Sequence, residues 1–378
     1  MIRACTILFW LTTCITAVNG ADESIGFYIG TGTDETDGGV FLSELNPQTG
    51  VIATPELAAP ANRCTFLALH PTKPILYGVA ETYANDPVDS VGIVAWKMDP
   101  ATKSLTKLNH QPAGGDGPCF VTVSDDGRFA ALANYGSGSI TVYPLDGDGV
   151  IQPMTSNIWH RGSSIDAGRQ GEAHAHSVRF DSQGKRLLAA DLGTDKVYLY
   201  DVSDDGKLTP SSTPTFDLPP GSGPRHFVFS RDGRFVFVLN EMKGTISTFD
   251  YEHLIAAPLY TTTTMADDIR DDAARSSAEI LLHPTLPVIY CSNRGPSEIA
   301  TLDVDENTGK VTRRGAIASG GLTPRNFNLT PDGRWLIVAN QDSGSLAVLS
   351  IDPTTGELSD TAIRASVPSP MCIKFIRP

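Results

Sequence analysis

Two histidines stand two residues apart in the segment RQGEAHAH, which runs from Arg169 to His176. On an extended backbone, His174 and His176 face the same side of the chain. The ordinary pKa of histidine lies close to neutrality, so either ring is a candidate general acid or base. A metal site is the alternative reading, but no third ligand follows at a spacing typical of metal sites. We therefore predict a catalytic histidine, with no metal and no cofactor.

Three arginines occur in short recurring phrases: Arg225 in GPRHF, Arg294 in CSNRG and Arg325 in TPRNF. The planar guanidinium group suits two-pronged recognition of a carboxylate or phosphate. If the three groups lie close together, they repel one another unless a bound anion or acidic partners offset them. Glu241 and Glu279 are the expected partners, and Glu241 becomes a second candidate base if burial raises its pKa. The alternative is a salt-bridge network that only ties the fold together.

The predicted site residues form two groups. The catalytic group is His174, His176, Arg225, Glu241 and Arg294. The substrate-binding group is Glu81, Arg169, Gln170, Asn240, Glu279, Asn293 and Arg325. Asn240 and Asn293 also belong to a repeated Asn/Asp position, for which a structural role is favoured because such side chains satisfy backbone groups at strand ends.

These residues lie in copies of one repeated phrase. Each copy is an apolar alternation, a turn containing glycine or proline, and a second apolar run that ends near Asn or Asp. The clear copies are Pro118–Tyr135, Ala175–Leu192, Pro224–Glu241 and Pro324–Gln341, and the looser ones are Cys64–Glu81 and Ser277–Arg294. Alternation at period two with an Asp-Gly turn predicts a β-hairpin. Two further strands follow each hairpin, so the unit is four strands at a period of about 50 residues, which is typical of a propeller blade.

The chain ends supply one more blade. Ile25–Ile29 and Gly39–Leu45 read as strands that lack a first strand, and Met371–Arg377 reads as a first strand that lacks a second. Joining them closes the ring and removes two exposed sheet edges. The sequence therefore predicts an all-β, seven-bladed β-propeller with four antiparallel strands per blade, forming a single domain over residues 21–378.

Aligning the hairpins places the unusual residues on one rim. The start of each first strand and the end of each second strand share an end of the hairpin, and the first strand lines the central channel. The first-strand column reads Thr65, Cys119, His176, Arg225, Ala278, Arg325 and Cys372, and the second-strand column reads Glu81, Tyr135, Leu192, Glu241, Arg294 and Gln341. The variety of residue types in these columns predicts a binding site at the channel mouth rather than a structural position.

Composition narrows the class of partner and the compartment. The formal net charge is −14, which disfavours nucleic-acid binding, so the expected partner is a small anionic molecule. Residues 1–20 combine Arg3, an apolar run and small residues before Ala21, which predicts a cleaved signal peptide, no lasting membrane span and export to the periplasm or cell exterior. A lipid anchor at Cys14 is a minor alternative. The remaining cysteines, Cys64, Cys119, Cys291 and Cys372, lack zinc-ligand spacing, and their placement predicts separate, mostly buried thiols.

Ordered phrases along almost the whole chain resemble the lactonase-type propeller family, which includes 6-phosphogluconolactonases and, as relatives, carboxy-muconate cycloisomerases. The matching phrases are YIGTGT, ANYGSGSITVYP, RQ with HAH, GSGPRHFVF, LNE, AEI with HP, YCSNRG, GG with TPRNF, and VANQDSG. By motif, the resemblance implies an active mouth built from His174 or His176, Arg225, Glu241 and Arg294. An export signal is a departure, because a cytoplasmic sugar-phosphate lactonase needs none.

The combined expectation is a hydrolase that opens a small anionic lactone. The arginines would hold the substrate's anionic group and the developing oxyanion, and His176 or Glu241 would activate water. The chain has no Gly-x-Ser-x-Gly motif that would indicate a serine nucleophile. Two alternatives stay open: muconate-type ring closure at the same site, and an exported propeller that only binds a partner. The acidic stretch from Ala266 to Arg275 is expected to be a solvated loop, with a structural Ca²⁺ site as the minor reading.

Overall fold

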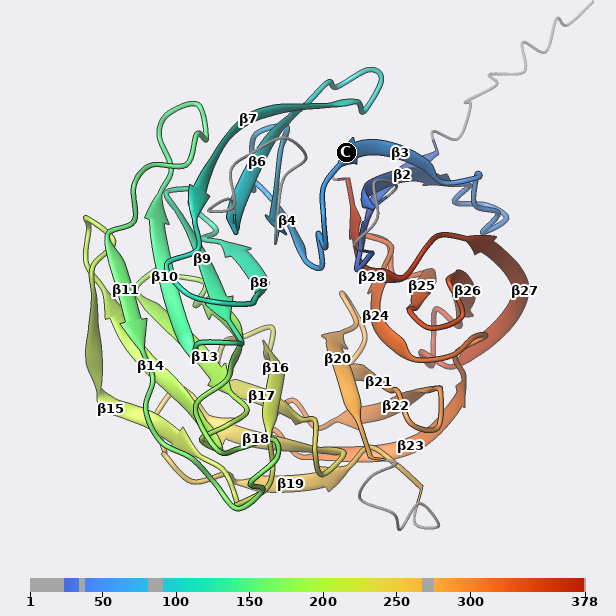
Figure 1. Cartoon of the computed structure of the whole chain (residues 1–378). Coiled ribbons are helices and arrows are strands. Elements are labelled where there is room, and N and C mark those ends of the chain that lie inside the picture. The colour runs from blue at the N-terminus through green and yellow to red at the C-terminus, as the bar shows by residue number, and fades with distance from the viewer. Residues whose placement is uncertain (1–23, 34–37, 81–90, 267–274, 377–378) are drawn as a thin grey trace, which may run out of the picture.

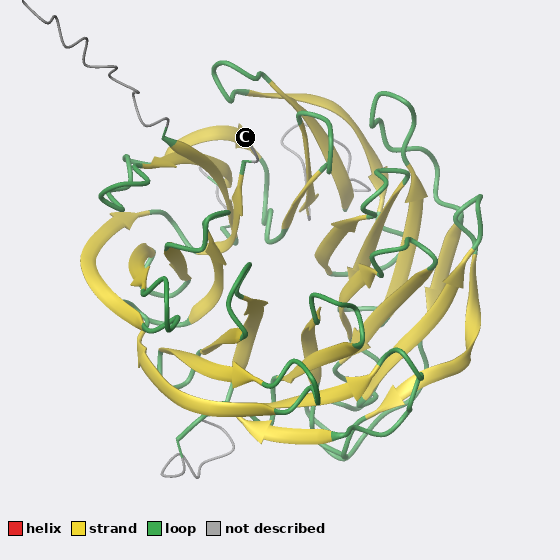
Figure 2. Ribbon diagram, turned by 180° about the vertical axis from the view of Figure 1, so that it is seen from behind, coloured by secondary structure: helices red, strands yellow, loops and turns green. Residues whose placement is uncertain are grey.

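The computed structural model describes residues 24–33, 38–80, 91–266 and 275–376. These residues form seven four-stranded antiparallel sheets arranged around a central axis, with strands and loops but no helix (Figures 1 and 2). The predicted seven-bladed β-propeller is confirmed. No helix of the described residues is long and apolar enough to cross a membrane. The signal-peptide prediction, with Cys14, falls outside the described residues.

The blades are given from inner to outer strand. Blade one consists of β28 (Pro370–Phe375), β1 (Ile25–Thr31), β2 (Gly39–Leu45) and β3 (Glu56–Pro60). Blade two consists of β4 (Leu67–Leu69), β5 (Ile75–Ala80), β6 (Gly92–Met98) and β7 (Leu105–Pro112). Blade three consists of β8 (Pro118–Val123), β9 (Phe129–Asn134), β10 (Ser139–Pro144) and β11 (Ser156–Trp159). Blades four and five are β12 (Ala175–Phe180), β13 (Arg186–Asp191), β14 (Lys196–Val202) and β15 (Leu208–Asp217), and β16 (Pro224–Phe229), β17 (Phe235–Asn240), β18 (Thr245–Asp250) and β19 (Tyr260–Thr263). Blades six and seven are β20 (Ser277–Leu282), β21 (Val288–Asn293), β22 (Glu298–Val304) and β23 (Val311–Ala318), and β24 (Pro324–Leu329), β25 (Trp335–Asn340), β26 (Ser345–Ile351) and β27 (Leu358–Ser366).

Blade one closes the ring as predicted. Its inner strand β28 comes from the carboxyl-terminal end of the chain and pairs antiparallel with β1, with Phe27 opposite Phe375 and Ile29 opposite Ile373. The seven inner strands contact one another in sequence around the axis. No blade therefore depends on an unpaired edge at the junction of the two chain ends.

Tight turns set the phase of the inner hairpins. Gly127, Gly184, Gly233 and Gly333 occupy the predicted turn position, each with φ between 65° and 72°. A side chain is disfavoured at such a positive φ, so glycine fixes where each hairpin reverses. The start of the first strand and the end of the second are thereby brought to the same rim in each blade.

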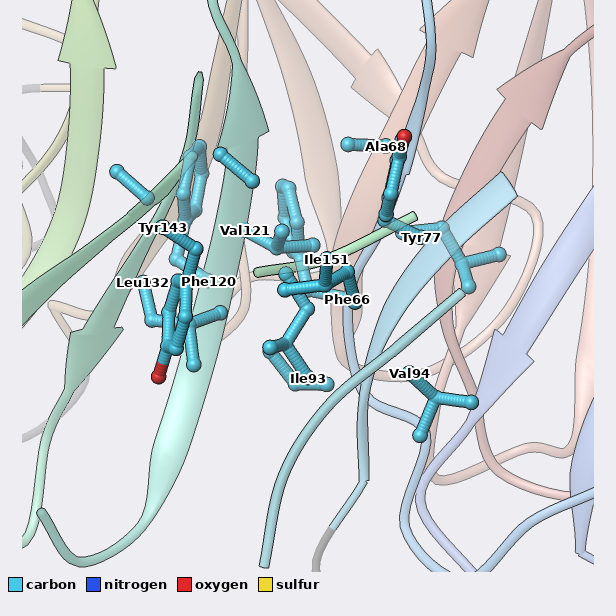
Figure 3. Packing of buried hydrophobic residues seen from close by; sticks show 14 of the residues in the cluster. Phe66, Ala68, Tyr77, Ile93, Val94, Phe120, Val121, Leu132, Tyr143 and Ile151 are labelled. Atoms are coloured by element: carbon cyan, nitrogen blue, oxygen red, sulfur yellow. The ribbon is translucent and has the colours of Figure 1, made fainter. Parts of the chain in front are cut away.

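Apolar side chains from neighbouring blades form the core. Phe66 before blade two stacks on Phe120 of blade three with ring centroids 4.0 Å apart, and Tyr77, Val121 and Leu132 belong to the same buried cluster (Figure 3). Buried tyrosines also join blades through hydrogen bonds, since the Tyr77 hydroxyl donates to the carbonyl of Gly149 at 2.7 Å. Two residues after the first-strand column, the inner strands carry an apolar residue that is buried in each case: Leu67, Val121, Val178, Phe227, Ile280 and Phe327. This packing holds the inner strands rigid around the axis.

The four cysteines of the described residues are free thiols, as expected. Cys64, Cys291 and Cys372 are buried and Cys119 is half-buried. Burial raises the pKa of each thiol, which keeps it protonated and unreactive near neutrality.

Candidate active site

A β-bulge opens most of the inner strands at the predicted rim column. In β8, β12, β16 and β24 the ladder skips one residue, and the skipped residues are Cys119, His176, Arg225 and Arg325. The ladder of β20 is irregular between Ser277 and Ile280. A bulged residue is released from the regular alternation and can be re-aimed, which is why bulges are frequent beside active sites. Here the release turns the rim residues toward the channel mouth.

Three of the skipped residues, Cys119, His176 and Arg325, line one cavity of about 360 Å³, which we call the mouth cavity. Its lining comes from residues in or beside strands of all seven blades. The lining includes Arg63, Thr65, Cys119, Tyr135, Arg169, His176, Glu241, Arg294, Arg325 and Met371. A smaller cavity of about 10 Å³ continues inward, against His176, Arg225, His226 and Arg325. Four of the five predicted catalytic residues therefore lie at these two cavities, and His174 does not: the four are His176, Arg225, Glu241 and Arg294.

Glu241 is the centre of the charged cluster. It follows β17, it is only 3% exposed, and its carboxylate forms ion pairs with Arg169 at 2.7 Å and with Arg225 and Arg294 at 3.0 Å. Burial alone would raise the pKa of Glu241, but the three guanidinium groups outweigh it and lower the pKa to about 2. Glu241 could act as a base near neutrality only if its pKa were raised. The shift has the opposite sign, so the carboxylate is a permanent anion that holds the arginines.

The arginines still exceed the available negative charge. Burial, together with Arg294 and Arg325, lowers the pKa of Arg225 to about 9. Burial and Arg294 likewise lower the pKa of Arg325, whose Nη1 donates to Gln341 at 3.3 Å. Lowered pKa values on clustered cations mean that added negative charge is favourable there. The mouth cavity is therefore suited to an anionic group or to an oxygen that develops charge.

The two histidines of the HAH segment have different surroundings. His176 is 5% exposed, lines the mouth cavity, and meets the edges of Tyr135 and His226 with centroids 5.4 Å apart in each case. Burial, followed by the charges of Arg225, His226 and Arg325, lowers the pKa of His176 well below 6.5. The ring is neutral at pH 7 and can accept a proton.

His174 lies outside β12 and is held by Tyr135. Its ring stacks on the Tyr135 ring at 4.5 Å, its Nδ1 lies 2.9 Å from the Tyr135 carbonyl oxygen, and its backbone N–H donates to Asp191. His174 is absent from the mouth cavity lining. Both histidines contact Tyr135, but of the two only His176 lines the mouth cavity.

Glu279 belongs to a deeper layer than expected. Its carboxylate accepts from His226 Nδ1 at 2.8 Å and from Asn326 Nδ2, and among the ion pairs of the described residues it meets none of the three predicted arginines. His226 Nε2 in turn lies 3.3 Å from Arg225 Nη1, and that same Nη1 donates to the carbonyl of Ala278. Glu279 therefore supports Arg225 from below, through His226, instead of pairing with it.

Three predicted substrate-binding residues use their side chains in hydrogen bonds within the fold. Gln170 is fully buried and its amide donates to Leu192 and Asp195. Asn240 donates to Thr245 and Ser247, and Asn293 donates to Thr264 and Glu298. Their side chains do not line the mouth cavity, in agreement with the favoured structural reading of the Asn column. Glu81 lies outside the described residues.

Asp195 is a functional candidate that the sequence did not reveal. Its buried carboxylate accepts hydrogen bonds from Ser164 and Gln170 on the loop that carries Arg169, and from the backbone N–H groups of Gly221 and Gly223, just before Arg225. Asp195 thus fixes two arginine-bearing loops relative to each other. Its four donors come from segments about 30 residues away on either side, so no local motif marks it.

Replacing Asp195 with asparagine should loosen both loops. The amide NH₂ would face donors that now meet a carboxylate, so we expect a loss of about 2 kcal/mol in unfolding free energy. We also expect a tenfold or larger loss of kcat/KM, because small displacements of charged groups are costly. Urea denaturation and steady-state kinetics measure the two effects. Asp204→Asn, at a fully exposed aspartate in the same blade, is the matched control and should change neither.

Further residues at the site stand in or beside the two rim columns. Tyr135 stands in the second-strand column and Cys119 in the first-strand column. Arg63 precedes the first-strand column by two residues, and His226 follows Arg225 directly. Only the bulge lets adjacent residues such as Arg225 and His226 both lie toward the axis, and strict alternation hides this. Most of the acidic stretch from Ala266 to Arg275, including the possible Ca²⁺ site, lies outside the described residues.

Comparison with known proteins identifies the family. A family model described as a seven-bladed β-propeller lactonase matches residues 26–375. The chain belongs to this lactonase family. The predicted resemblance is thereby confirmed.

Several relatives of the lactonase carry a named activity. The 6-phosphogluconolactonase of Bacillus subtilis strain 168 is 31% identical over 92% of this chain and 97% of its own, and that of Formosa agariphila is 31% identical over 88% and 94%. Among solved structures, a Bacteroides fragilis protein assigned as a 6-phosphogluconolactonase has a TM-score of 0.85 at 32% identity and covers 95% of this chain and 99% of its own. The periplasmic gluconolactonase of Pseudomonas aeruginosa has a TM-score of 0.87 at 27% identity over 94% and 99%. The lactonase is therefore a 6-phosphogluconolactonase-like member of a hydrolase family.

Proposed function

We propose that this lactonase hydrolyses a small anionic aldonolactone in the mouth cavity. The single observation that carries the proposal is a neutral histidine, His176, beside a cluster of arginines whose charge exceeds that of Glu241. Relatives and solved structures named for lactones of gluconic acid support the substrate class. A volume of about 360 Å³ lies at the lower end of the range for small-molecule sites, which suits one sugar ring.

The arginines supply the electrostatic part of the mechanism. Attack on a lactone carbonyl places negative charge on the carbonyl oxygen, and Arg225, Arg294 and Arg325 are preorganised cations at that side of the cavity. Preorganised positive charge in a buried site stabilises such an oxyanion without reorganisation at the moment of reaction. The same groups would bind the substrate's anionic substituent and the product's new carboxylate.

His176 supplies the proton transfers. As water attacks the carbonyl carbon, one of its protons passes to the neutral ring of His176, and the carbon–oxygen bond of the lactone ring then breaks. The departing ring oxygen takes that proton back, so the product is an open hydroxy acid and His176 returns to its neutral form. The small inner cavity beside His176 and Arg225 has the size of one water molecule. Glu241 keeps its charge throughout and positions the guanidinium groups.

Turnover measurements test the proposal. We expect glucono-1,5-lactone and 6-phosphoglucono-1,5-lactone to be hydrolysed well above their spontaneous rates, with the phosphorylated lactone having the lower KM because of its added charge. Muconate-type acids test ring closure on the same cavity. Turnover of muconates without lactone hydrolysis would favour the cycloisomerase, and activity on neither class would reject the enzyme assignment.

We also propose that the protein is exported, on the basis of the leader-like residues 1–20. Fractionation of cells that express the full chain, followed by amino-terminal sequencing of the mature protein, tests this. A mature protein that retains Met1 and stays with the cytosol would contradict it.

A further inference from the structure

A second cavity of about 360 Å³ lies beside the mouth cavity on the same rim. We call it the side chamber. Its walls come from the loop before β12, the turn after β17 and the residues before β20, and they include Ile165, Asp166, Arg169, Met242, Lys243 and Arg275. Arg169 and Glu241 line both cavities, so the ion pair between them is the partition.

The partition is built so that it can open on one side. Glu241 is buried and also pairs with the buried Arg225, whereas the Arg169 side chain is 46% exposed and its Nη2 meets Glu241 Oε1 at 2.7 Å. Rotation of Arg169 away from Glu241 would leave Arg225 and Arg294 in place. The two cavities would then form one continuous cleft.

The charge of the side chamber differs from that of the mouth. Four arginines and one glutamate line the mouth cavity, whereas the side chamber combines Arg169, Lys243 and Arg275 with Asp166 and Glu241. An anionic group is therefore favoured in the mouth, and the nearly balanced side chamber suits a neutral polar group. Ile165, 70% exposed, and Met242 add apolar contact area. Donors and acceptors mixed with apolar contacts, in a volume equal to that of the mouth, match a sugar ring.

We propose that the side chamber binds a second sugar residue, so that the preferred substrate is a glycosyl-aldonolactone whose lactone ring lies in the mouth cavity. This inference rests on the proposed function for the placement of the lactone ring. It changes the substrate from a small anionic lactone to an extended, uncharged one, and the arginines of the mouth cavity then meet the oxyanion and the product's carboxylate. A one-ring substrate fits with Arg169 in place, whereas a two-ring substrate requires Arg169 to rotate away from Glu241.

A matched pair of lactones tests this inference. Cellobiono-1,5-lactone and glucono-1,5-lactone differ by one glucose residue, and we expect kcat/KM to be about tenfold or more higher for the disaccharide. Met242→Trp and Ile165→Trp fill the side chamber and should each remove that advantage, while turnover of glucono-1,5-lactone stays within about twofold. Val51→Trp, at a distant exposed position, is the control for an added indole ring. Equal kcat/KM values for the two lactones in the wild type, or equal losses for both lactones in the variants, would overturn the inference.

Binding of the reaction products separates this inference from the proposed function. If neither lactone is hydrolysed, the proposed function fails, and titration calorimetry with cellobionate and gluconate still reports on the side chamber. Cellobionate binding about tenfold more tightly than gluconate, with the difference lost in both tryptophan variants, supports a sugar subsite. Equal binding of the two overturns it. So does tight binding of 6-phosphogluconate that both variants abolish, because the side chamber would then hold a phosphate.

Discussion

Replacing His176 with glutamine should lower kcat by about 10²-fold to 10⁴-fold, the usual contribution of a positioned general base. His176 lines the mouth cavity and its pKa is lowered well below 6.5 by burial and by Arg225, so its neutral form is available at pH 7. KM should change little, because the arginines that bind negative charge remain in place. Steady-state kinetics on 6-phosphoglucono-1,5-lactone, corrected for spontaneous hydrolysis, measure both parameters. A normally folded variant with wild-type kcat would exclude His176 as the base.

The pH profile and a neighbouring histidine make this prediction specific. A base acts in its deprotonated form, so lowering its pKa moves the acid limb of the profile to lower pH. In the wild type, kcat/KM should stay flat as the pH falls through 6.5 and decline only further into the acid range. His174→Gln, which alters the ring stacked on Tyr135, should cost far less than His176→Gln. A larger loss from His174→Gln, or a limb centred at pH 6.5 or above, would reverse the assignment.

Replacing Glu241 with glutamine should cost about 3–5 kcal/mol of unfolding free energy, as expected when one partner of a buried ion pair is removed. The Glu241 side chain is 4% exposed and its carboxylate faces Arg169, Arg225 and Arg294, so the isosteric amide leaves the buried Arg225 and the mostly buried Arg294 without compensation. We expect added phosphate to raise the melting temperature of this variant more than that of the wild type, because the anion takes the place of the carboxylate. Urea denaturation and thermal melts with and without phosphate measure these effects.

The pH dependence gives this prediction a sign that can be checked. The pKa of Glu241 in the folded protein is lowered from 4.5 to about 2, so its stabilising effect is complete above pH 4.5 and is lost as the pH falls toward 2. The stability gap between wild type and Glu241→Gln should therefore close over that range. Asp217→Asn removes a surface partner of Lys196 and should cost less than about 1 kcal/mol. A Glu241→Gln variant as stable as this control would contradict a central role for the carboxylate.

The repeated hairpin phrase predicts most of the fold and part of the candidate site. Hairpin phrases recur at a regular period, and the glycines in their turns fix the phase, so blade number, ring closure and the rim column were all predictable. His176, Arg225, Glu241, Arg294 and Arg325 reach one mouth because phase alone decides which rim they occupy.

The phase of the hairpins does not predict how deep a side chain lies in the channel or which groups it contacts. Glu279 and Glu241 have the same side chain at neighbouring positions of the ring, yet one meets His226 and the other meets arginines. The difference follows from local irregularities in the inner strands, which alternation does not encode. Asp195 was missed because its donors are distant in sequence, and the direction of the Glu241 pKa depends on how many guanidinium groups finally meet it.

The inner-strand bulges bear on how such a protein can acquire new specificity. Cys119, His176, Arg225 and Arg325 are the residues that the β-ladder skips, so exchanging their side chains breaks no pairing between strands. Selection can alter these positions one blade at a time while the apolar residues two places further on keep each sheet packed. His176, Arg225 and Arg325 carry the proposed chemistry, so Cys119 is the skipped position at which family members with different substrates should vary most, and a library confined to it should yield folded proteins at high frequency.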